Sequence, residues 1–281
     1  MPGVMTGEAL WRLSAPGPAP SALTAVASAV AYVYAVYVLV AFLIFLSPNA
    51  PWQKAVEGAK TLDAQNPAWV NAPIHVRAGI DVALFALWAT VHSTLARPLV
   101  KKTLLLGAWN RPVFVAQGAG LLHFLIAQWV PLTYVLWDVP KAWHTTLWCA
   151  FVGGAIITLT ASFALDHFAL FGLSDGFGVD INRLVGLKES EKDRDDASPA
   201  LSSRWHYTLV AHPMMSGFLI SFWCVPCLTL GHFLFSSLAT VYILTATSLL
   251  EEPDLRRELG PAYEHYLRSV PSFCPFAPPR R

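Results

Sequence analysis

A series of long apolar segments constrains this chain more than any other feature. A helix needs about 17–25 mostly apolar residues to cross the hydrocarbon core of a bilayer. Six segments are of about that length: residues 21–46, 78–95, 113–137, 143–165, 205–224 and 231–250. Because lipid offers no water to the backbone, a spanning segment must satisfy its own hydrogen bonds, as an α-helix does. The sequence therefore predicts an all-α, polytopic integral membrane protein with about six transmembrane helices.

The composition supports this prediction. Hydrophobic residues make up 55% of the 281 residues and charged residues 13%, whereas about a quarter of the residues in a soluble domain are charged. The net charge of +1 gives no electrostatic basis for binding nucleic acid. The four cysteines, without paired histidines at ligand spacing, predict neither a disulfide framework nor a metal site. We therefore expect the lipid bilayer as the environment of the chain, no nucleic-acid partner and no metal.

The chain is predicted to form one domain. Residues 1–20 are rich in glycine and proline, so we expect a flexible N-terminus. Residues 21–281 then form a single transmembrane domain, because no polar stretch is long enough to bury a core of its own. Pro131 and Pro213 fall inside predicted spans, and each is expected to kink its helix.

The distribution of lysine and arginine predicts an orientation. With six spans and a cytosolic N-terminus, 15 of these residues fall on the cytosolic side and 4 on the other side. Lysine and arginine are enriched in the cytosolic loops of membrane proteins. We therefore expect the loop 174–204 and both termini in the cytosol, together with the helix ends that carry His212 and Glu251.

The last third of the chain holds a predicted helical hairpin with polar residues at both of its ends. His212-Pro213 stands at its start and Glu251-Glu252 at its end. Because a hairpin returns the chain to the side it left, His212 and the two glutamates are expected at similar membrane depth. Their convergence predicts a binding site for a charged small molecule. The alternatives are a buried histidine in a kinked helix and a simple polar stop after an apolar helix.

An amphipathic segment follows the hairpin. Tyr263, Tyr266 and Val270 fall on one face of a helix, which is the pattern of a helix at a membrane interface. This helix is expected to act either as a membrane anchor or as a cytosolic lid over the predicted site.

These motifs resemble a known superfamily. The pattern His212-Pro213-x-x-x-Gly217, then Glu251-Glu252 and Gly260-x-x-Tyr263-x-x-Tyr266, resembles the S-adenosylmethionine-binding end of the isoprenylcysteine carboxyl methyltransferase superfamily. Residues 217–223, 229–235 and 242–244 are similar to the methanethiol S-methyltransferase family and to its nurim and NnrU-type relatives. The sequence departs from the superfamily at Ala211, where an arginine usually precedes His-Pro.

The resemblance implies an S-adenosylmethionine-dependent thiol S-methyltransferase. The expected reaction is methylation of a small volatile thiol, methanethiol, to dimethyl sulfide. The cofactor-binding residues that the resemblance implies are Tyr207, His212, Pro213, Gly217, Glu251, Glu252 and Tyr263. His212 and His92 are candidate catalytic bases, because the nucleophile must be a thiolate. Two alternatives stay open: a nurim-like structural membrane protein without catalysis, and a carboxyl methyltransferase of a lipidated cysteine.

Further ionisable residues lie in or beside the predicted spans. Asp81, His92, Asp166 and His167 are costly to place there, so each is a candidate for contact with substrate or cofactor. The segments around His92 and His167 also resemble the methanethiol-methylating family. The alternative is that these groups pair with one another for structural reasons.

Overall fold

The computed structural model describes residues 18–279, except residues 65–66, 70, 105 and 186–204. Most of the predicted flexible N-terminus and more than half of the predicted cytosolic loop 174–204 therefore lie outside the described residues. The described part is mostly helical, which confirms the all-α class of the membrane protein.

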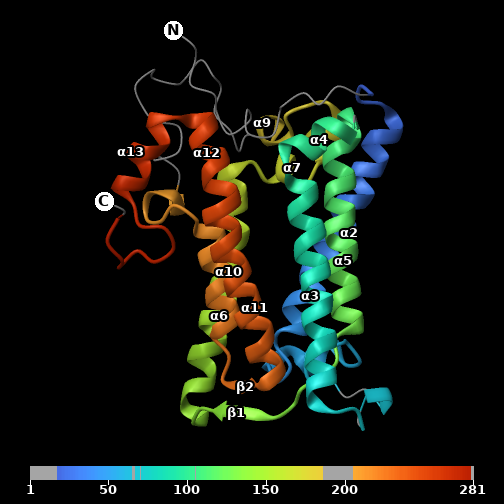
Figure 1. Cartoon of the computed structure of the whole chain (residues 1–281), viewed down its shortest axis with the longest axis vertical. Coiled ribbons are helices and arrows are strands. Elements are labelled where there is room, and N and C mark those ends of the chain that lie inside the picture. Colours follow the sequence, from blue (N-terminus) through green and yellow to red (C-terminus); the bar gives the residue numbers. More distant parts are fainter. Residues whose placement is uncertain (1–17, 65–66, 70, 105, 186–204, 280–281) are drawn as a thin grey trace.

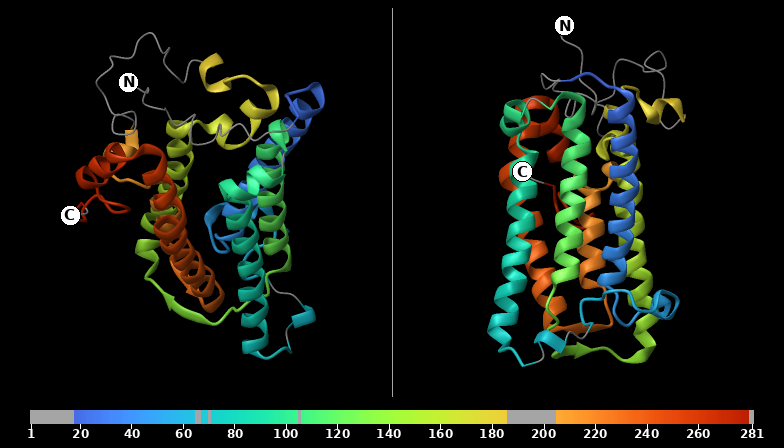
Figure 2. Two further views of the ribbon diagram at one scale, coloured as in Figure 1. Left: turned by 45° about the horizontal axis from the view of Figure 1, so that its top comes forward. Right: turned by 90° about the vertical axis from the view of Figure 1, so that its right-hand side faces the viewer.

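Two groups of long helices stand side by side (Figures 1 and 2). The first group contains α2 (Ala22–Phe45), α3 (Ile74–Ala96) and α5 (Asn110–Gln128), and the second contains α6 (His144–Leu165), α10 (Pro213–Trp223) and α11 (Leu230–Ala246). Shorter helices lie at their ends: α4 (Pro98–Leu104), α7 (His167–Leu170), α8 (Leu173–Phe177), α9 (Ile181–Leu184), α12 (Glu252–Leu259) and α13 (Pro261–Ser269). Short 3₁₀ segments are Pro51–Val56, Pro67–Trp69, Gly107–Trp109, Lys141–Trp143 and Trp205–Thr208, and Thr247–Glu251 is a π-helical turn.

Four helical segments of the described chain are long and apolar enough to cross a membrane: Ala22–Phe45, Ile74–Ala96, Lys141–Leu165 and Leu230–Arg257. The protein is thus a multi-pass integral membrane protein, but the prediction of about six spans is not confirmed. α10 has 11 residues, and at 1.5 Å per residue it is about 16 Å long, roughly half the hydrocarbon thickness of a bilayer. α5 has 19 residues, but glutamines, a histidine and an arginine make it less apolar.

Both predicted proline kinks are wrong, because each proline lies outside the interior of a helix. α5 ends at Gln128 and residues 129–134 are not helical, so Pro131 follows the helix. α10 begins at Pro213, and His212 before it has a non-helical φ of −126° and ψ of 63°. Proline disfavours helical geometry in the residue before it. It also fits the first helical position, where its missing N–H costs nothing.

A two-stranded sheet closes the end of the bundle opposite α12 (Figure 1). Strand β1 (Val135–Asp138) pairs antiparallel with β2 (Cys227–Thr229), with Val135 opposite Thr229 and Asp138 opposite Cys227. The pairing ties the connection between α5 and α6 to the connection between α10 and α11. This end is called the strand end below, and the opposite end, with α12 and α13, is called the polar end.

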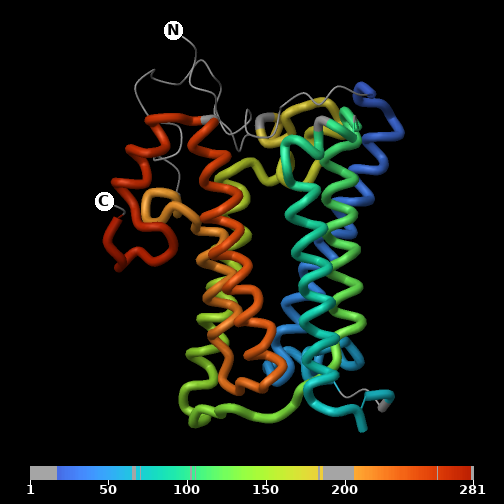
Figure 3. The backbone as a smooth tube through the Cα atoms, in the orientation of Figure 1, coloured from blue at the N-terminus to red at the C-terminus, as the bar shows by residue number. Residues whose placement is uncertain are grey.

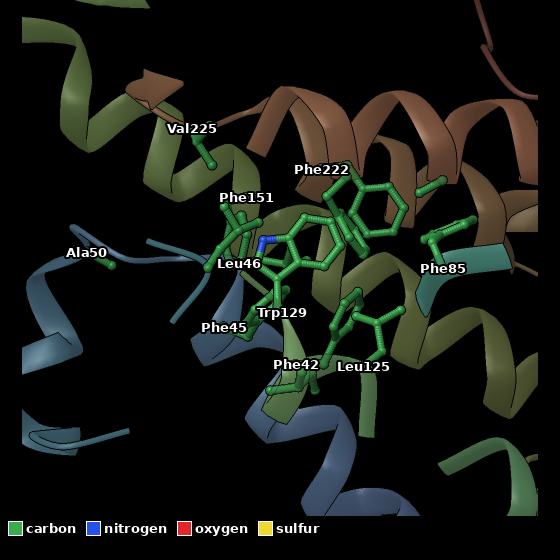
Figure 4. Packing of buried hydrophobic residues seen from close by; sticks show 14 of the residues in the cluster. Phe42, Phe45, Leu46, Ala50, Phe85, Leu125, Trp129, Phe151, Phe222 and Val225 are labelled. Carbon is green, nitrogen blue, oxygen red and sulfur yellow. The ribbon is translucent and has the colours of Figure 1, made fainter. Parts of the chain in front are cut away.

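An aromatic cluster joins the two helix groups, with Trp129, Phe42 and Phe222 facing one another (Figure 4). The ring of Phe235 in α11 is 5.6 Å from Phe42 in α2, 5.7 Å from Trp129 and 5.5 Å from Phe222 in α10, measured between centroids. All of these side chains are buried. Inside a membrane, helices associate through van der Waals packing of this kind, so the cluster is a main contact between the two groups.

Glycines bring α10 close to α6. A Cβ atom at Gly217 would collide with Thr158 Oγ1 and with the carbonyl oxygen of Gly154. A Cβ atom at Gly154 would in turn collide with the carbonyl oxygen of Gly217. Small residues of this kind allow two helix backbones to approach closely inside a membrane. The contact fixes α10, and it thereby positions His212 at the polar end.

Candidate functional site

His212 and the two glutamates come together at the polar end. His212 immediately precedes α10, while Glu251 and Glu252 lie where the π-helical turn passes into α12. The Nε2 atom of His212 is 3.3 Å from Glu252 Oε1, within hydrogen-bond distance. The Nδ1 atom is 3.7 Å from Glu251 Oε1, on the other side of the ring. The hairpin thus returns the chain to its starting level, as the sequence predicted.

The three side chains differ in exposure. His212 is 5% and Glu252 1% exposed, whereas the side chain of Glu251 is 44% exposed. Burial by itself lowers the pKa of His212, but the hydrogen bonds and negative charges of Glu251 and Glu252 outweigh burial and raise this pKa to about 9. The two carboxylates therefore favour the protonated form of the His212 ring.

The chain that follows α13 holds the backbone of His212 in place. The N–H groups of Ala211 and His212 donate to the carbonyl oxygens of Pro271 and Ser272, at 2.8 and 2.9 Å. In Figure 3 this C-terminal segment lies beside the segment that precedes α10. Ala211 is buried in an apolar cluster with Tyr263 and Tyr266. The longer side chain of an arginine would have to displace that cluster.

The tyrosines of α13 face the protein. Tyr266 donates from its hydroxyl to the carbonyl oxygen of Tyr207 at 2.8 Å. Tyr263 is 1% exposed, and its buried hydroxyl has no hydrogen-bond partner among the described residues. Burial, and then the charges of Glu252 and Glu251, raise the pKa of Tyr263 above its ordinary value, so its phenol stays protonated. Helix α13 therefore packs its tyrosines against the segment that precedes His212, so this face of the helix contacts protein.

The remaining residues of the predicted site lie around this cluster or away from it. Tyr207 is buried, and burial followed by the charge of Glu251 raises its pKa. Pro213 begins α10, and Gly217 makes its close approach to α6. His92 lies in α3, in the other helix group, where its ring stacks on Trp88 with centroids 5.3 Å apart. The Nδ1 atom of His92 has no hydrogen-bond partner in the described part of the chain.

Asp81, Asp166 and His167 make contacts that stabilise the fold. Asp81 Oδ1 accepts a hydrogen bond from the backbone N–H of Val130 at 2.8 Å. Asp166 Oδ1 accepts from Asn182 Nδ2 at 2.6 Å. His167 interacts with Ser162 Oγ at 2.7 Å through Nδ1 and with Tyr32 Oη at 3.1 Å through Nε2. These groups thus have structural partners, although none of the contacts named joins them to one another.

Sequence reasoning did not identify two arginines near the acidic residues of α12. Arg256 Nη2 lies 3.7 Å from Glu252 Oε2, and its Nε donates to Glu264 Oε1 of α13 at 2.7 Å. Arg97 follows α3, and its Nη1 is 3.2 Å from Asp254 Oδ2. The i, i+4 spacing of Glu252 and Arg256 could have indicated the first pair. The second pair joins residues far apart in the chain and has no local signal.

Comparison with known proteins assigns the family. The chain is 34% identical over 200 residues to a methanethiol S-methyltransferase of Pseudomonas sp., which covers 70% of this chain and 72% of that protein. It is 33% identical over 211 residues to the methanethiol S-methyltransferase of Mycobacterium tuberculosis, which covers 74% and 82% of the two chains. The chain belongs to the methanethiol S-methyltransferase family. Membership in this enzyme family implies that the protein uses a methyl donor.

A second group of relatives has a different name. The chain is 24% identical over 231 residues to a nurim homolog of Drosophila melanogaster, covering 79% of this chain and 87% of that protein. No family model matches the chain, and no solved structure matches it significantly. Within the described residues, no group of three or more histidine, cysteine, aspartate or glutamate side chains could hold a metal ion.

Proposed function

We propose that this protein transfers a methyl group from S-adenosylmethionine to a small thiol, methanethiol, and releases dimethyl sulfide. The observation that carries the proposal is the cluster of His212, Glu251 and Glu252 at the polar end, in a chain of this family. The relatives described above are methanethiol S-methyltransferases, and this supports the choice of thiol. The proposed site residues are His212, Glu251, Glu252 and Tyr263, with Tyr207 beside them and Pro213 and Gly217 setting the position of α10.

The side chains present fit such a cofactor. S-adenosylmethionine carries an ammonium group, and the partly exposed carboxylate of Glu251 is able to accept hydrogen bonds from it. The buried hydroxyl of Tyr263 has no acceptor among the described residues, so it is a donor still available to a ligand. His212 and Glu252 are both buried and hold Glu251 in position. When bound, the cofactor supplies a methyl group activated by a sulfonium.

The chain's own part in the reaction is to align the reactants, exclude water and help to form the thiolate. Alignment and exclusion of water alone can lower the barrier substantially. Because the two glutamates favour the protonated form of His212, we place the base at His92. Its Nδ1 is buried and has no described partner, and its ring lies among Trp88 and Phe114, an apolar setting suited to a small thiol.

The proposal includes the finer topology of six crossings, with the polar end in the cytosol. Four helices qualify as spans on their own. α5 runs alongside the spanning helices (Figure 1), and the shorter α10 is preceded by residues 205–212, of which Trp205–Thr208 form a 3₁₀ turn. The 15-to-4 division of lysine and arginine supports the cytosolic placement. A protease site inserted in the loop 186–204 is expected to be cut from the cytosolic side only.

A headspace assay tests the reaction. Purified protein in detergent or liposomes receives methanethiol and S-adenosylmethionine with a labelled methyl group, and volatile products are measured. We expect labelled dimethyl sulfide from the complete mixture and none when either reactant is omitted. A farnesylated cysteine analogue is expected to be inert. If the analogue is methylated and no dimethyl sulfide forms, the protein is a carboxyl methyltransferase and the proposal is wrong.

The nurim homologues favour a second candidate, a structural membrane protein without catalysis. In this case the buried ion pairs of His212 would serve only to close the hairpin. Calorimetric titration separates the two candidates, because a structural protein is expected to bind no S-adenosylmethionine.

A further inference from the structure

A ligand that carries a carboxylate needs a cation at the polar end. Two cationic side chains of this end, His212 and Arg256, already form ion pairs with glutamates. Both ring nitrogens of His212 face glutamate oxygens, at 3.3 and 3.7 Å. Arg256 is held between Glu252 and Glu264, at 3.7 and 2.7 Å. A carboxylate approaching either of these cations would therefore meet carboxylates that are already in place.

Arg97 uses fewer of its donors in contacts with the protein. The residue follows α3, so it reaches the polar end from the helix group that does not carry His212. Its Nη1 lies 3.2 Å from Asp254 Oδ2. Its Nε is buried and has no hydrogen-bond partner among the described residues. A guanidinium presents five N–H donors in a plane, and it binds carboxylates through pairs of them. Arg97 thus keeps a donor for which an incoming acceptor is the natural partner.

The position of Arg97 suits one end of an amino-acid group. Asp254 follows Glu251 by three residues in a helical segment, so the two side chains are neighbours on one helix face, with Cβ atoms about 5–6 Å apart. Arg97 contacts Asp254, and Glu251 contacts His212. The cation of Arg97 is therefore held against the same helix face that carries the partly exposed carboxylate of Glu251. This is the arrangement that a zwitterionic amino acid requires, with carboxylate and ammonium on neighbouring atoms.

We propose that Arg97 binds the carboxylate of the amino-acid moiety of the methyl donor, while Glu251 accepts from its ammonium group. The inference rests on the proposed function and adds a specificity-determining residue to it. Arg97 also connects the two helix groups, because Asp254 belongs to α12. Binding of the ligand at Arg97 and Glu251 would therefore join the groups at the polar end, as the aromatic cluster does elsewhere in the bundle.

The test is calorimetric titration of Arg97→Ala with two ligands, S-adenosylmethionine and decarboxylated S-adenosylmethionine. The matched control is Arg257→Ala, since Arg257 Nη1 donates to the same Asp254 at 3.0 Å but its side chain is 76% exposed. We expect Arg97→Ala to weaken binding of S-adenosylmethionine more than tenfold and to leave binding of the decarboxylated ligand unchanged. Arg257→Ala is expected to leave both affinities near those of the natural protein. Arg97→Lys keeps the charge without the planar donors, and its affinity for S-adenosylmethionine is expected to fall severalfold. This variant provides the test if Arg97→Ala does not fold.

Two outcomes overturn the assignment. Equal affinity of Arg97→Ala and the natural protein for S-adenosylmethionine would show that the carboxylate binds elsewhere. An equal loss for both ligands would show that Arg97 acts only through the structure of the polar end. If the natural protein binds neither ligand, the proposed function itself fails, and this result is distinct from a failure confined to Arg97.

Discussion

The two ends of the bundle each bury a carboxylate, but they use it differently. At the strand end, Asp81 is 0% exposed and accepts a hydrogen bond from the backbone of Val130. Two cationic side chains at this end also form hydrogen bonds with the backbone. Lys60 donates to the carbonyl oxygen of Trp129 at 3.1 Å, and Arg77 donates to the carbonyl oxygen of Pro131 at 3.0 Å. Charged groups here satisfy the polar backbone of a segment that is not helical.

At the polar end, the charged groups contact one another. Glu252 is 1% exposed and lies between His212 and Arg256. Glu251 and Tyr263 keep acceptor or donor capacity that the described contacts do not use fully. Contacts between side chains can be exchanged for contacts with a ligand, whereas contacts that close the backbone cannot be given up without local unfolding. The comparison predicts that substitutions at the strand end change stability alone, and that substitutions at the polar end change ligand binding.

The largest effect is expected from Glu252→Ala. The substitution leaves His212 buried without its closest carboxylate and removes one of the two glutamates that contact Arg256. Removing one partner of a buried ion pair costs about 3–5 kcal/mol. Both the thermal unfolding temperature in detergent and the affinity for S-adenosylmethionine should fall. In the control variant Glu252→Gln, the unfolding temperature and the affinity should fall less. A variant with natural stability and natural affinity would contradict the role given to this carboxylate.

Asp81→Ala is expected to separate stability from binding. The substitution leaves the buried N–H of Val130 without its acceptor, which costs about 1–3 kcal/mol. Asp81→Asn keeps an oxygen that can accept and is expected to cost less. Thermal unfolding should report the loss, while calorimetry should give the same S-adenosylmethionine affinity per folded molecule. A selective loss of affinity would mean that the strand end contributes to the ligand site.

A smaller and gradual effect is expected from pH. The glutamates raise the pKa of His212 from its ordinary value near 6.5 to about 9. The pairing therefore contributes its full stability below about pH 6.5 and loses it as the pH rises through about 9. The unfolding temperature of the natural protein should fall across this window more than that of His212→Asn. Parallel curves for the two proteins would show that His212 does not carry the charge.

The sequence was sufficient to predict the polar end because its geometry follows from a hairpin. His212 directly precedes the first helix of the hairpin and Glu251 and Glu252 follow the second, so the hairpin brings all three to the same end of the bundle. The close approach at Gly217 was also predictable as a feature, since only glycine lacks a side chain. The helix that Gly217 approaches was not predictable, and in the structure it is α6.

Other features depend on contacts that are distant in sequence. The end of α5 at Gln128 is accompanied by the hydrogen bond from Val130 to Asp81, which lies 49 residues away. The segment before α10 likewise pairs with a distant part of the chain, because the N–H groups of Ala211 and His212 donate to the carbonyl oxygens of Pro271 and Ser272. Arg97 joins the site through Asp254, across the two helix groups. Hydropathy and local spacing carry no information on such pairs, so the sequence predicted longer spans and no role for Arg97.

The central claim is that the polar end binds the methyl donor through Glu251, and two matched glutamates test it directly. Glu251 and Glu264 are both at this end, and their side chains are 44% and 45% exposed. Calorimetric titration of S-adenosylmethionine is to be compared for Glu251→Gln and Glu264→Gln. We predict that Glu251→Gln weakens binding more than tenfold, because it removes a charge-assisted contact worth about 1.5–3 kcal/mol. Glu264→Gln should stay close to the natural protein, and equal affinities for the two variants would contradict the account.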